Sequence, residues 1–273
     1  RNTHKTIVWA DQKNKKQTKT AVVYVHGFSS SRQETAPLCD RVAAQLNANL
    51  FYTRLTGHGQ TGYHLGEATV DDWFRDVAEA IEIGRYLGEK VVLVGNSTGS
   101  TLLAWLAATG QLVRQPSQRD DIAALVLMSP NTGLRAAGSE LLTMPFAKQM
   151  LRIVEGETQE WDAFSPKHAA YWTLSYPSKA LIPMMETVKL LRRADISKIQ
   201  QPVLMIYSPN DQVVDPKTMQ TFFNSLETPH RELILMDEVQ DRNNHVLAGD
   251  ALSPDTTDEI AEHIIHFVKP HLD

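Results

Sequence analysis

Short runs of apolar, often β-branched residues alternate along the chain with segments whose apolar residues recur every three or four positions. Most runs are apolar throughout, which is typical of strands buried on both faces of a parallel sheet. The predicted strands cover residues 21–25, 50–53, 91–94, 122–128, 203–207 and 232–236, with residues 6–10 as a candidate edge strand. The alternation with helical segments predicts an α/β fold, a mostly parallel central sheet flanked by helices.

Three of the helical segments begin with recognisable capping residues. Residues 69–72 have the form of a capping box, and the apolar stripe that follows places Trp73, Val77, Ile81 and Gly84 on one face. The pairs Asp215-Pro216 and Ser253-Pro254 each put an N-cap residue before a proline suited to the first helical position. These signals predict helices that start near positions 70, 216 and 254.

One interval interrupts the alternation of strand and helix. Residues 131–198 separate two predicted strands, where a connection normally needs a single helix. The interval is rich in apolar residues and is divided by four prolines, which predicts a small helical insertion. We therefore expect a core domain of residues 1–130 and 199–273 and a helical cap of residues 131–198. The insertion either only packs on the core or also serves as a lid over a site.

The sequence Gly95-Asn96-Ser97-Thr98-Gly99 stands between the apolar run 91–94 and a helix-like segment, residues 100–108. A serine between a buried strand and a helix lies on a sharp turn that exposes its hydroxyl, and the flanking glycines relieve the crowding of that turn. The free N–H groups at the start of the helix would face an oxyanion formed beside Ser97. This setting predicts that Ser97 is a nucleophile.

A serine nucleophile needs a base and a carboxylate that orients the base, both on loops that follow strand ends. Asp211 lies in a turn directly after the predicted strand 203–207, whereas its neighbour Asp215 is better explained as a helix N-cap. His245 alone among ten histidines falls in the loop between the last predicted strand and the last helix. We therefore expect Asp211 and His245 to complete a catalytic triad with Ser97.

The oxyanion of such a reaction needs two hydrogen-bond donors. The backbone N–H of Thr98, next to the nucleophile, is the first expected donor. The second should come from the loop after strand 21–25, where His26-Gly27-Phe28-Ser29 makes the N–H of Phe28 the candidate.

These pieces together carry a family resemblance that spans nearly the whole chain. They are His26-Gly27-Phe28, the stretch Arg54-Leu55-Thr56-Gly57-His58-Gly59, Asp72-Trp73, the Ser97 turn, Asp211 and His245. The chain resembles α/β-hydrolases and, among them, bacterial carboxylesterases and monoacylglycerol lipases. The resemblance implies a serine hydrolase that cleaves short- to medium-chain acyl esters or monoacylglycerols through an acyl-enzyme, with a small-molecule ester as substrate. It also implies that His58 belongs to a structural loop.

Two departures from that family stand beside the nucleophile. Ser100 occupies a position where these relatives usually have glycine, and Asn96 is an uncommon residue before the serine. Because the same triad also serves amides and thioesters on this fold, a peptidase, an amidase or a thioesterase is an alternative. Four carboxylates of the insertion could bind a substrate amine: Glu140, Glu155, Glu157 and Glu160. An alternative that is not an enzyme is a binding protein with the same fold and no catalytic activity.

Composition bears on nucleic-acid binding, disulfide bonds, metal sites and cofactors. The chain has 27 basic and 32 acidic residues, a net charge of −5 that gives no reason to expect nucleic-acid binding, and the lysines of the first twenty residues indicate a solvated loop. The single cysteine, Cys39, excludes an internal disulfide and is expected to pack within a helix over residues 36–46. His263 and His266 lack the glutamate of a zinc motif, and no phosphate-binding glycine motif is present, so we expect no cofactor and no metal.

No apolar stretch reaches the roughly 20 residues that cross a bilayer, so no integral membrane segment is expected. The chain begins at Arg1. A cytoplasmic domain and a domain cut from an exported or anchored precursor both fit this start, and the oligomeric state is left open.

Overall fold

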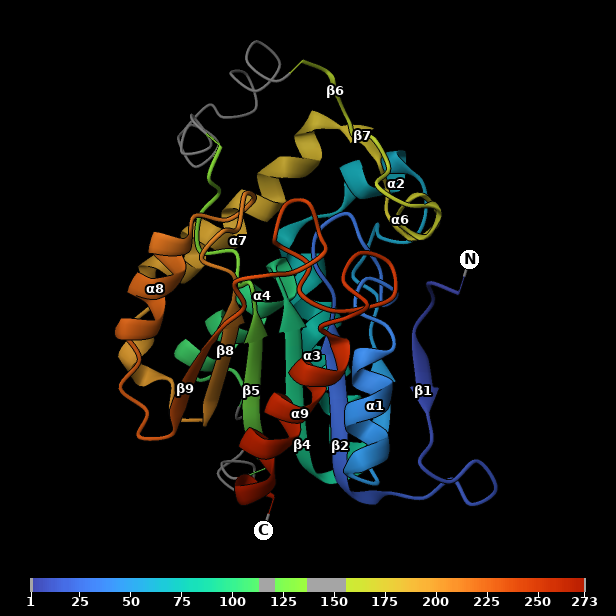
Figure 1. Ribbon diagram of the computed structural model, residues 1–273, viewed down its shortest axis with the longest axis vertical. Coiled ribbons are helices and arrows are strands. Elements are labelled where there is room, and N and C mark those ends of the chain that lie inside the picture. The colour runs from blue at the N-terminus through green and yellow to red at the C-terminus, as the bar shows by residue number, and fades with distance from the viewer. Residues whose placement is uncertain (1, 113–120, 137–155, 273) are drawn as a thin grey trace.

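A mostly parallel sheet organises the computed structural model, which describes residues 2–112, 121–136 and 156–272. Within those residues seven strands pair in the order β1-β3-β2-β4-β5-β8-β9 (Figure 1). β1 pairs antiparallel with β3, and every other pair is parallel. The strands are β1 Thr6–Val8, β2 Thr18–Val25, β3 Asn49–Tyr52, β4 Gly88–Asn96, β5 Ile122–Met128, β8 Val203–Tyr207 and β9 Arg231–Leu235. The predicted fold class is confirmed.

The burial of the strands follows their place in the sheet. β5 and β8 are buried at every position, and β2 and β4 are buried from their middle to their carboxyl ends. This agrees with continuous apolar runs covered on both faces. β9 differs because it forms an edge, and its residues are half-buried or exposed.

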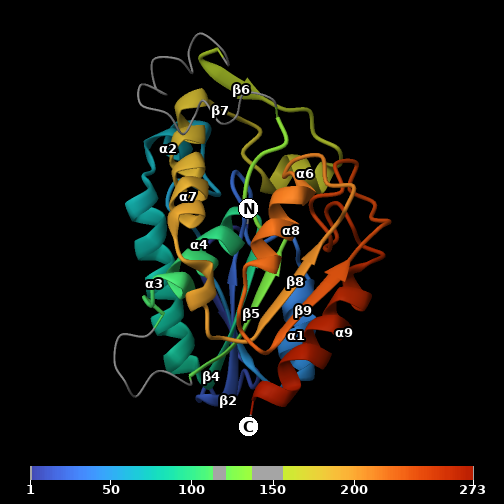
Figure 2. The same ribbon diagram turned by 90° about the vertical axis from the view of Figure 1, so that its left-hand side faces the viewer.

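Helices cover both faces of the sheet (Figures 1 and 2). One apolar cluster joins α1 and α9 to one face of β2 and β4, and Cys39 is buried in it as predicted. A larger cluster joins α3, α4, α7 and α8 to the opposite face, with Trp73 fully buried. The bounds are α1 Leu38–Gln45, α3 Val70–Leu87, α4 Thr98–Ala108, α7 Leu181–Arg193, α8 Pro216–Asn224 and α9 Thr257–Val268. No helix in the described ranges has both the length and the apolar character needed to cross a membrane.

Two of the three predicted helix starts are confirmed and one is wrong. Thr69 and Asp72 form a reciprocal capping box on α3, and the carboxylate of Asp215 accepts a hydrogen bond from the N–H of Lys217 at the start of α8. α9 begins at Thr257, three residues after the predicted proline. The Ser253 hydroxyl does not cap this helix, because it donates instead to the carbonyl of Val246, 2.6 Å away, in the loop that carries His245.

The chain between β5 and β8 places several short elements above the carboxyl ends of the strands (Figure 1). They are the hairpin β6 Thr158–Glu160 and β7 Ser175–Pro177, α6 Pro166–Tyr171, and a 3₁₀ turn at Ser178–Ala180. A second 3₁₀ turn, Ile196–Lys198, comes between α7 and the start of β8. α2, Gly62–Glu67, packs closely on β7, since a Cβ on Gly62 would lie 2.0 Å from the carbonyl of Ser175. The apolar positions 141, 142, 144, 146, 150 and 151 of the expected insertion lie outside the described residues. The division into core and cap stays a prediction.

Candidate active site

Ser97 occupies a strained turn between β4 and α4. Its backbone has φ 49° and ψ −116°, a conformation that few non-glycine residues adopt. A Cβ on Gly99 would lie 2.1 Å from the carbonyl of Val25, and one on Gly95 would lie 2.6 Å from the N of Ser100. Glycine at these two positions therefore permits the close approach of β2 and the tight start of α4.

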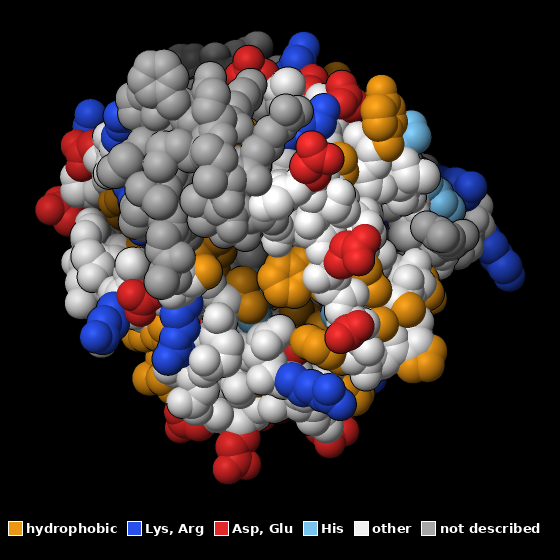
Figure 3. All heavy atoms as spheres, turned by 90° about the horizontal axis from the view of Figure 1, so that it is seen from above, with side chains coloured by type: hydrophobic (Ala, Val, Ile, Leu, Met, Phe, Trp, Pro, Cys, Tyr) orange, Lys and Arg blue, Asp and Glu red, His pale blue; other side chains and the backbone are white. Residues whose placement is uncertain are grey.

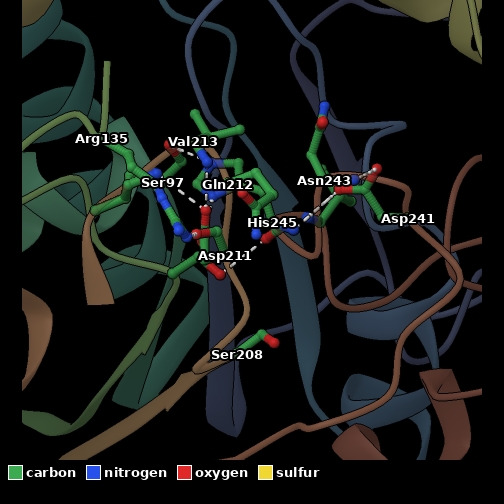
Figure 4. Close-up of polar contacts among 12 residues, drawn as sticks. Ser97, Arg135, Ser208, Asp211, Gln212, Val213, Asp241, Asn243 and His245 are labelled. Carbon is green, nitrogen blue, oxygen red and sulfur yellow. Dashed lines mark hydrogen bonds and ion pairs between the residues drawn. The ribbon is translucent and has the colours of Figure 1, made fainter. Parts of the chain in front are cut away.

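The structure brings Ser97, His245 and Asp211 into one hydrogen-bonded row (Figure 4). The Oγ of Ser97 lies 3.0 Å from Nε2 of His245, and Nδ1 of His245 lies 2.7 Å from Oδ2 of Asp211. Asp211 is fully buried, whereas His245 and Ser97 are 8% and 9% exposed. The row thus runs from the interior toward the solvent and ends at the serine hydroxyl.

Backbone groups orient the carboxylate of Asp211. Its Oδ1 accepts hydrogen bonds from the N–H groups of Val213, at 2.8 Å, and Val214, at 2.9 Å. The guanidinium of Arg135 donates to the backbone carbonyl of Asp211 at 2.8 Å. With Oδ1 occupied in this way, Oδ2 is directed at His245.

The loop of His245 depends on a second buried carboxylate, which the sequence interpretation missed. Oδ2 of Asp241 accepts hydrogen bonds from the N–H groups of His245, at 3.0 Å, and Val246, at 2.9 Å. Directly after β5, the Ser129 hydroxyl donates to the carbonyl of His245 at 2.8 Å. The position of Asp241 four residues before His245 was the only local sign of this arrangement.

Opposing effects set the pKa of His245. Burial lowers it, but the negative charge and hydrogen bond of Asp211 and the charges of Asp241 and Glu34 outweigh burial and raise the pKa above its ordinary 6.5. The imidazolium form is therefore stabilised at the point where a base would receive the proton of Ser97.

The two N–H groups expected to bind an oxyanion border this row. Thr98 is the first residue of α4, where an N–H has no partner within the helix. Phe28 follows Gly27, and a Cβ on Gly27 would lie 3.2 Å from the Cβ of Ser97, so this loop touches the serine. In the described part of the chain, neither the N–H of Thr98 nor that of Phe28 donates a hydrogen bond.

Two further buried histidines are held by backbone groups beside the site. The Nε2 of His26 accepts from the N–H of Leu55 at 3.1 Å, and the Nδ1 of His58 lies 3.1 Å from the carbonyl of Thr56. Burial lowers the pKa of His26 to about 4 and that of His58 well below 6.5. The indole N–H of Trp73 donates to the same carbonyl of Thr56, so these residues fix the loop after β3.

Among the described residues, no three His, Cys, Asp or Glu side chains gather in the way that a metal site requires.

Both the sequence and the fold of this chain are similar to those of known proteins. A model of the alpha/beta hydrolase family matches residues 22–254. A thermostable monoacylglycerol lipase from Bacillus sp. (strain H-257) is 21% identical over 215 residues, which cover 78% of this chain and 79% of the lipase. A solved structure described with LipS and LipT, two metagenome-derived lipolytic enzymes, has a TM-score of 0.76 at 18% identity, covering 98% of both chains. The monoacylglycerol lipase of Paleococcus ferrophilus has a TM-score of 0.69 at 16% identity, also covering 98% of both chains.

Proposed function

This chain belongs to the alpha/beta hydrolase family, and from that membership we propose that it is a serine hydrolase that cleaves carboxylic esters through an acyl-enzyme. The observation that carries the proposal is the hydrogen-bonded row of Ser97, His245 and Asp211. A serine hydroxyl becomes a nucleophile when a neighbouring base accepts its proton and a carboxylate orients that base.

Each residue of the row has one step in this mechanism. The Oγ of Ser97 attacks the ester carbonyl carbon while Nε2 of His245 accepts its proton. Asp211 holds Nδ1 of His245 protonated and stabilises the imidazolium, which then protonates the departing alcohol. Water attacks the acyl-enzyme by the same route and releases the acid.

Charge develops on the carbonyl oxygen in both steps. We assign the stabilisation of this charge to the N–H groups of Phe28 and Thr98. In support of this assignment, both groups lie beside Ser97, and neither donates to another acceptor in the described structure. Donors fixed in advance at this point stabilise the oxyanion more than the neutral carbonyl.

Apolar surroundings support an acyl ester as substrate, with short- to medium-chain esters or monoacylglycerols as the class. The ring of Phe28 packs edge-on against Tyr176 of β7, with 5.4 Å between the ring centres. Hydrophobic side chains gather in the middle of the face above the strand ends, where the surface is hollowed (Figure 3). The named relatives are lipases and lipolytic enzymes, which is consistent with this class.

We also propose that residues 131–198 cap the site. Their described part contacts both sides of it, because the N–H of Thr173 donates to the carbonyl of Ser29 at 2.7 Å and the hydroxyl of Ser165 donates to the carbonyl of Ala251 at 2.9 Å. The first contact reaches the loop of Phe28, and the second reaches the loop that follows His245.

A panel of p-nitrophenyl esters of increasing acyl length, run beside aminoacyl p-nitroanilides, tests the proposed substrate class. We expect ester hydrolysis with a preference for short to medium chains and little cleavage of the anilides. Of the insertion carboxylates that could bind a substrate amine, Glu157 and Glu160 are exposed and Glu140 and Glu155 lie outside the described residues. Cleavage of the anilides alone would replace the esterase proposal with a peptidase.

The raised pKa of His245 predicts how activity depends on pH. A base works only when neutral, so kcat/KM should be full above the pKa of His245 and should fall as the pH drops through it. Because the carboxylates raise that pKa, we expect the acid limb to have its midpoint above 6.5. The measurement is kcat/KM from pH 5 to 9 with an ester whose own hydrolysis is subtracted. A midpoint below 6.5 would contradict the assignment of His245 as the base in this electrostatic setting.

A further inference from the structure

A buried carboxyl group beside the loop that carries Phe28 takes no step in the mechanism above, although its charge helps to raise the pKa of His245. Glu34 is 2% exposed, and its Oε1 accepts hydrogen bonds from the N–H of Gly27 at 2.6 Å and from the hydroxyl of Tyr24 at 2.7 Å. A Cβ on Gly27 would lie 3.1 Å from Oε2 of Glu34 and 3.2 Å from Cβ of Ser97. Gly27 thus lies directly between the carboxyl group of Glu34 and Ser97.

The carbonyl of Gly27 is held from the other side by two buried donors. The hydroxyl of Ser30 donates to it at 2.9 Å, and Nδ1 of His26 lies 2.8 Å from it. Since Nε2 of His26 accepts the N–H of Leu55, the ring proton is assigned to Nδ1, which then donates to Gly27. With a pKa of about 4, His26 keeps this neutral form at neutral pH.

Peptide geometry transmits these contacts to Phe28. The carbonyl of Gly27 and the N–H of Phe28 belong to one planar trans peptide unit, so they point in opposite directions. Donors that fix the carbonyl therefore fix the direction of the Phe28 N–H as well. Glu34 fixes the preceding peptide unit, and rotation about the two bonds of Gly27, the least restricted residue type, is removed from both sides.

We propose that Glu34 is a positioning residue for the hydrolytic reaction, which, by binding the N–H of Gly27, keeps the N–H of Phe28 directed at the oxyanion. This inference rests on the proposed function, because it assigns a purpose to Glu34 only if Phe28 stabilises an oxyanion. Burying a carboxyl group is costly, and burial raises the pKa of Glu34 while the hydrogen bonds from Ser30, Tyr24 and Gly27 oppose that rise. A purely apolar side chain could fill this space but could not hold the N–H of Gly27.

The test compares kcat and KM in the full chain for Glu34→Ala, Glu34→Gln and the matched control Tyr24→Phe. Glu34→Ala should lower kcat by about 10- to 100-fold with KM changed less than about threefold, since loss of an entire oxyanion donor costs about 10²- to 10³-fold. Glu34→Gln keeps an acceptor for Gly27 and should restore kcat to within about fivefold of the unmodified protein. Tyr24→Phe removes the other hydrogen bond to the same oxygen and should lower the melting temperature with little change in kcat.

Outcomes of this comparison separate the two proposals. A protein that hydrolyses no ester refutes the proposed function itself. An active protein in which Glu34→Ala and Tyr24→Phe lose kcat equally, or in which neither does, refutes the positioning role and leaves Glu34 a structural residue. If Glu34→Ala does not fold, Ser30→Ala removes a donor from the carbonyl of Gly27 and a contact to Glu34, while the carboxyl group itself stays in place. That variant should also lower kcat and spare KM, and an unchanged kcat would overturn the proposal.

Discussion

Replacement of Ser97 by alanine is expected to lower kcat for ester hydrolysis by about 10⁴- to 10⁶-fold while the fold is retained. Without the Oγ, His245 has no proton to accept, and only the oxyanion donors and substrate binding remain to assist attack by water. Alanine fits the turn because Ser97 already adopts its positive φ with a Cβ in place. Kinetics with the preferred ester and a thermal unfolding curve measure the two halves of this prediction.

Covalent labelling adds a test that does not depend on knowing the substrate. A fluorophosphonate probe should attach to Ser97 in the unmodified protein, as read from the mass of the peptide that contains it, and should leave Ser97→Ala unlabelled. Ser100→Ala is the matched control, since Ser100 lies three residues on in α4 and its hydroxyl donates to the carbonyl of Met128 at 3.0 Å. It should lose about 1 kcal/mol of stability and keep both label and turnover. Labelling of folded Ser97→Ala to the same extent would remove Ser97 from the mechanism.

The strands of the sheet and the three side chains of the row could be anticipated from sequence for one physical reason. Buried parallel strands are continuous apolar runs, and their carboxyl ends meet at one edge of the sheet. Ser97 and Asp211 each follow a strand of this kind, and His245 lies in the loop after the parallel edge strand β9, so the position of each along the chain already implies a common location. Strands β5 and β8 were predicted to the residue.

Residues that act through tertiary contacts with the backbone left no such local pattern. Glu34 contacts Tyr24 and Gly27, and Asp241 contacts the N–H groups of its own loop, but neither belongs to a periodic stripe or a motif. The same limit explains why the start of α9 was predicted wrongly. The Ser253 hydroxyl donates to a carbonyl in the His245 loop, and the sequence rules for helix capping do not include such a partner. The short elements α2, β6 and β7 depend on one another rather than on their own propensities, as the contact of Gly62 with Ser175 shows.

Asp211→Asn is expected to lower kcat by about 10³- to 10⁴-fold, although it changes one atom of the side chain. The N–H groups of Val213 and Val214 both donate to Oδ1 of Asp211, so the amide oxygen of asparagine must take that place. Its NH₂ group then faces Nδ1 of His245, which can only accept from it. The ring proton is thereby moved to Nε2, and His245 can no longer accept the proton of Ser97. KM should change little, because Asp211 is fully buried behind the histidine.

Asp215→Asn is the matched control for this prediction, since it makes the same chemical change four residues later. Asp215 caps α8 by accepting from the N–H of Lys217 at 3.0 Å, and asparagine caps a helix about as well as aspartate. Turnover and melting temperature should therefore stay close to those of the unmodified protein. Both variants are compared with the unmodified protein by kcat, KM and thermal unfolding. A large loss of kcat in Asp215→Asn, with activity retained in Asp211→Asn, would show that Asp215 and not Asp211 is the acid of the triad. The opposite result would show that Asp211 acts by fixing the tautomer of His245.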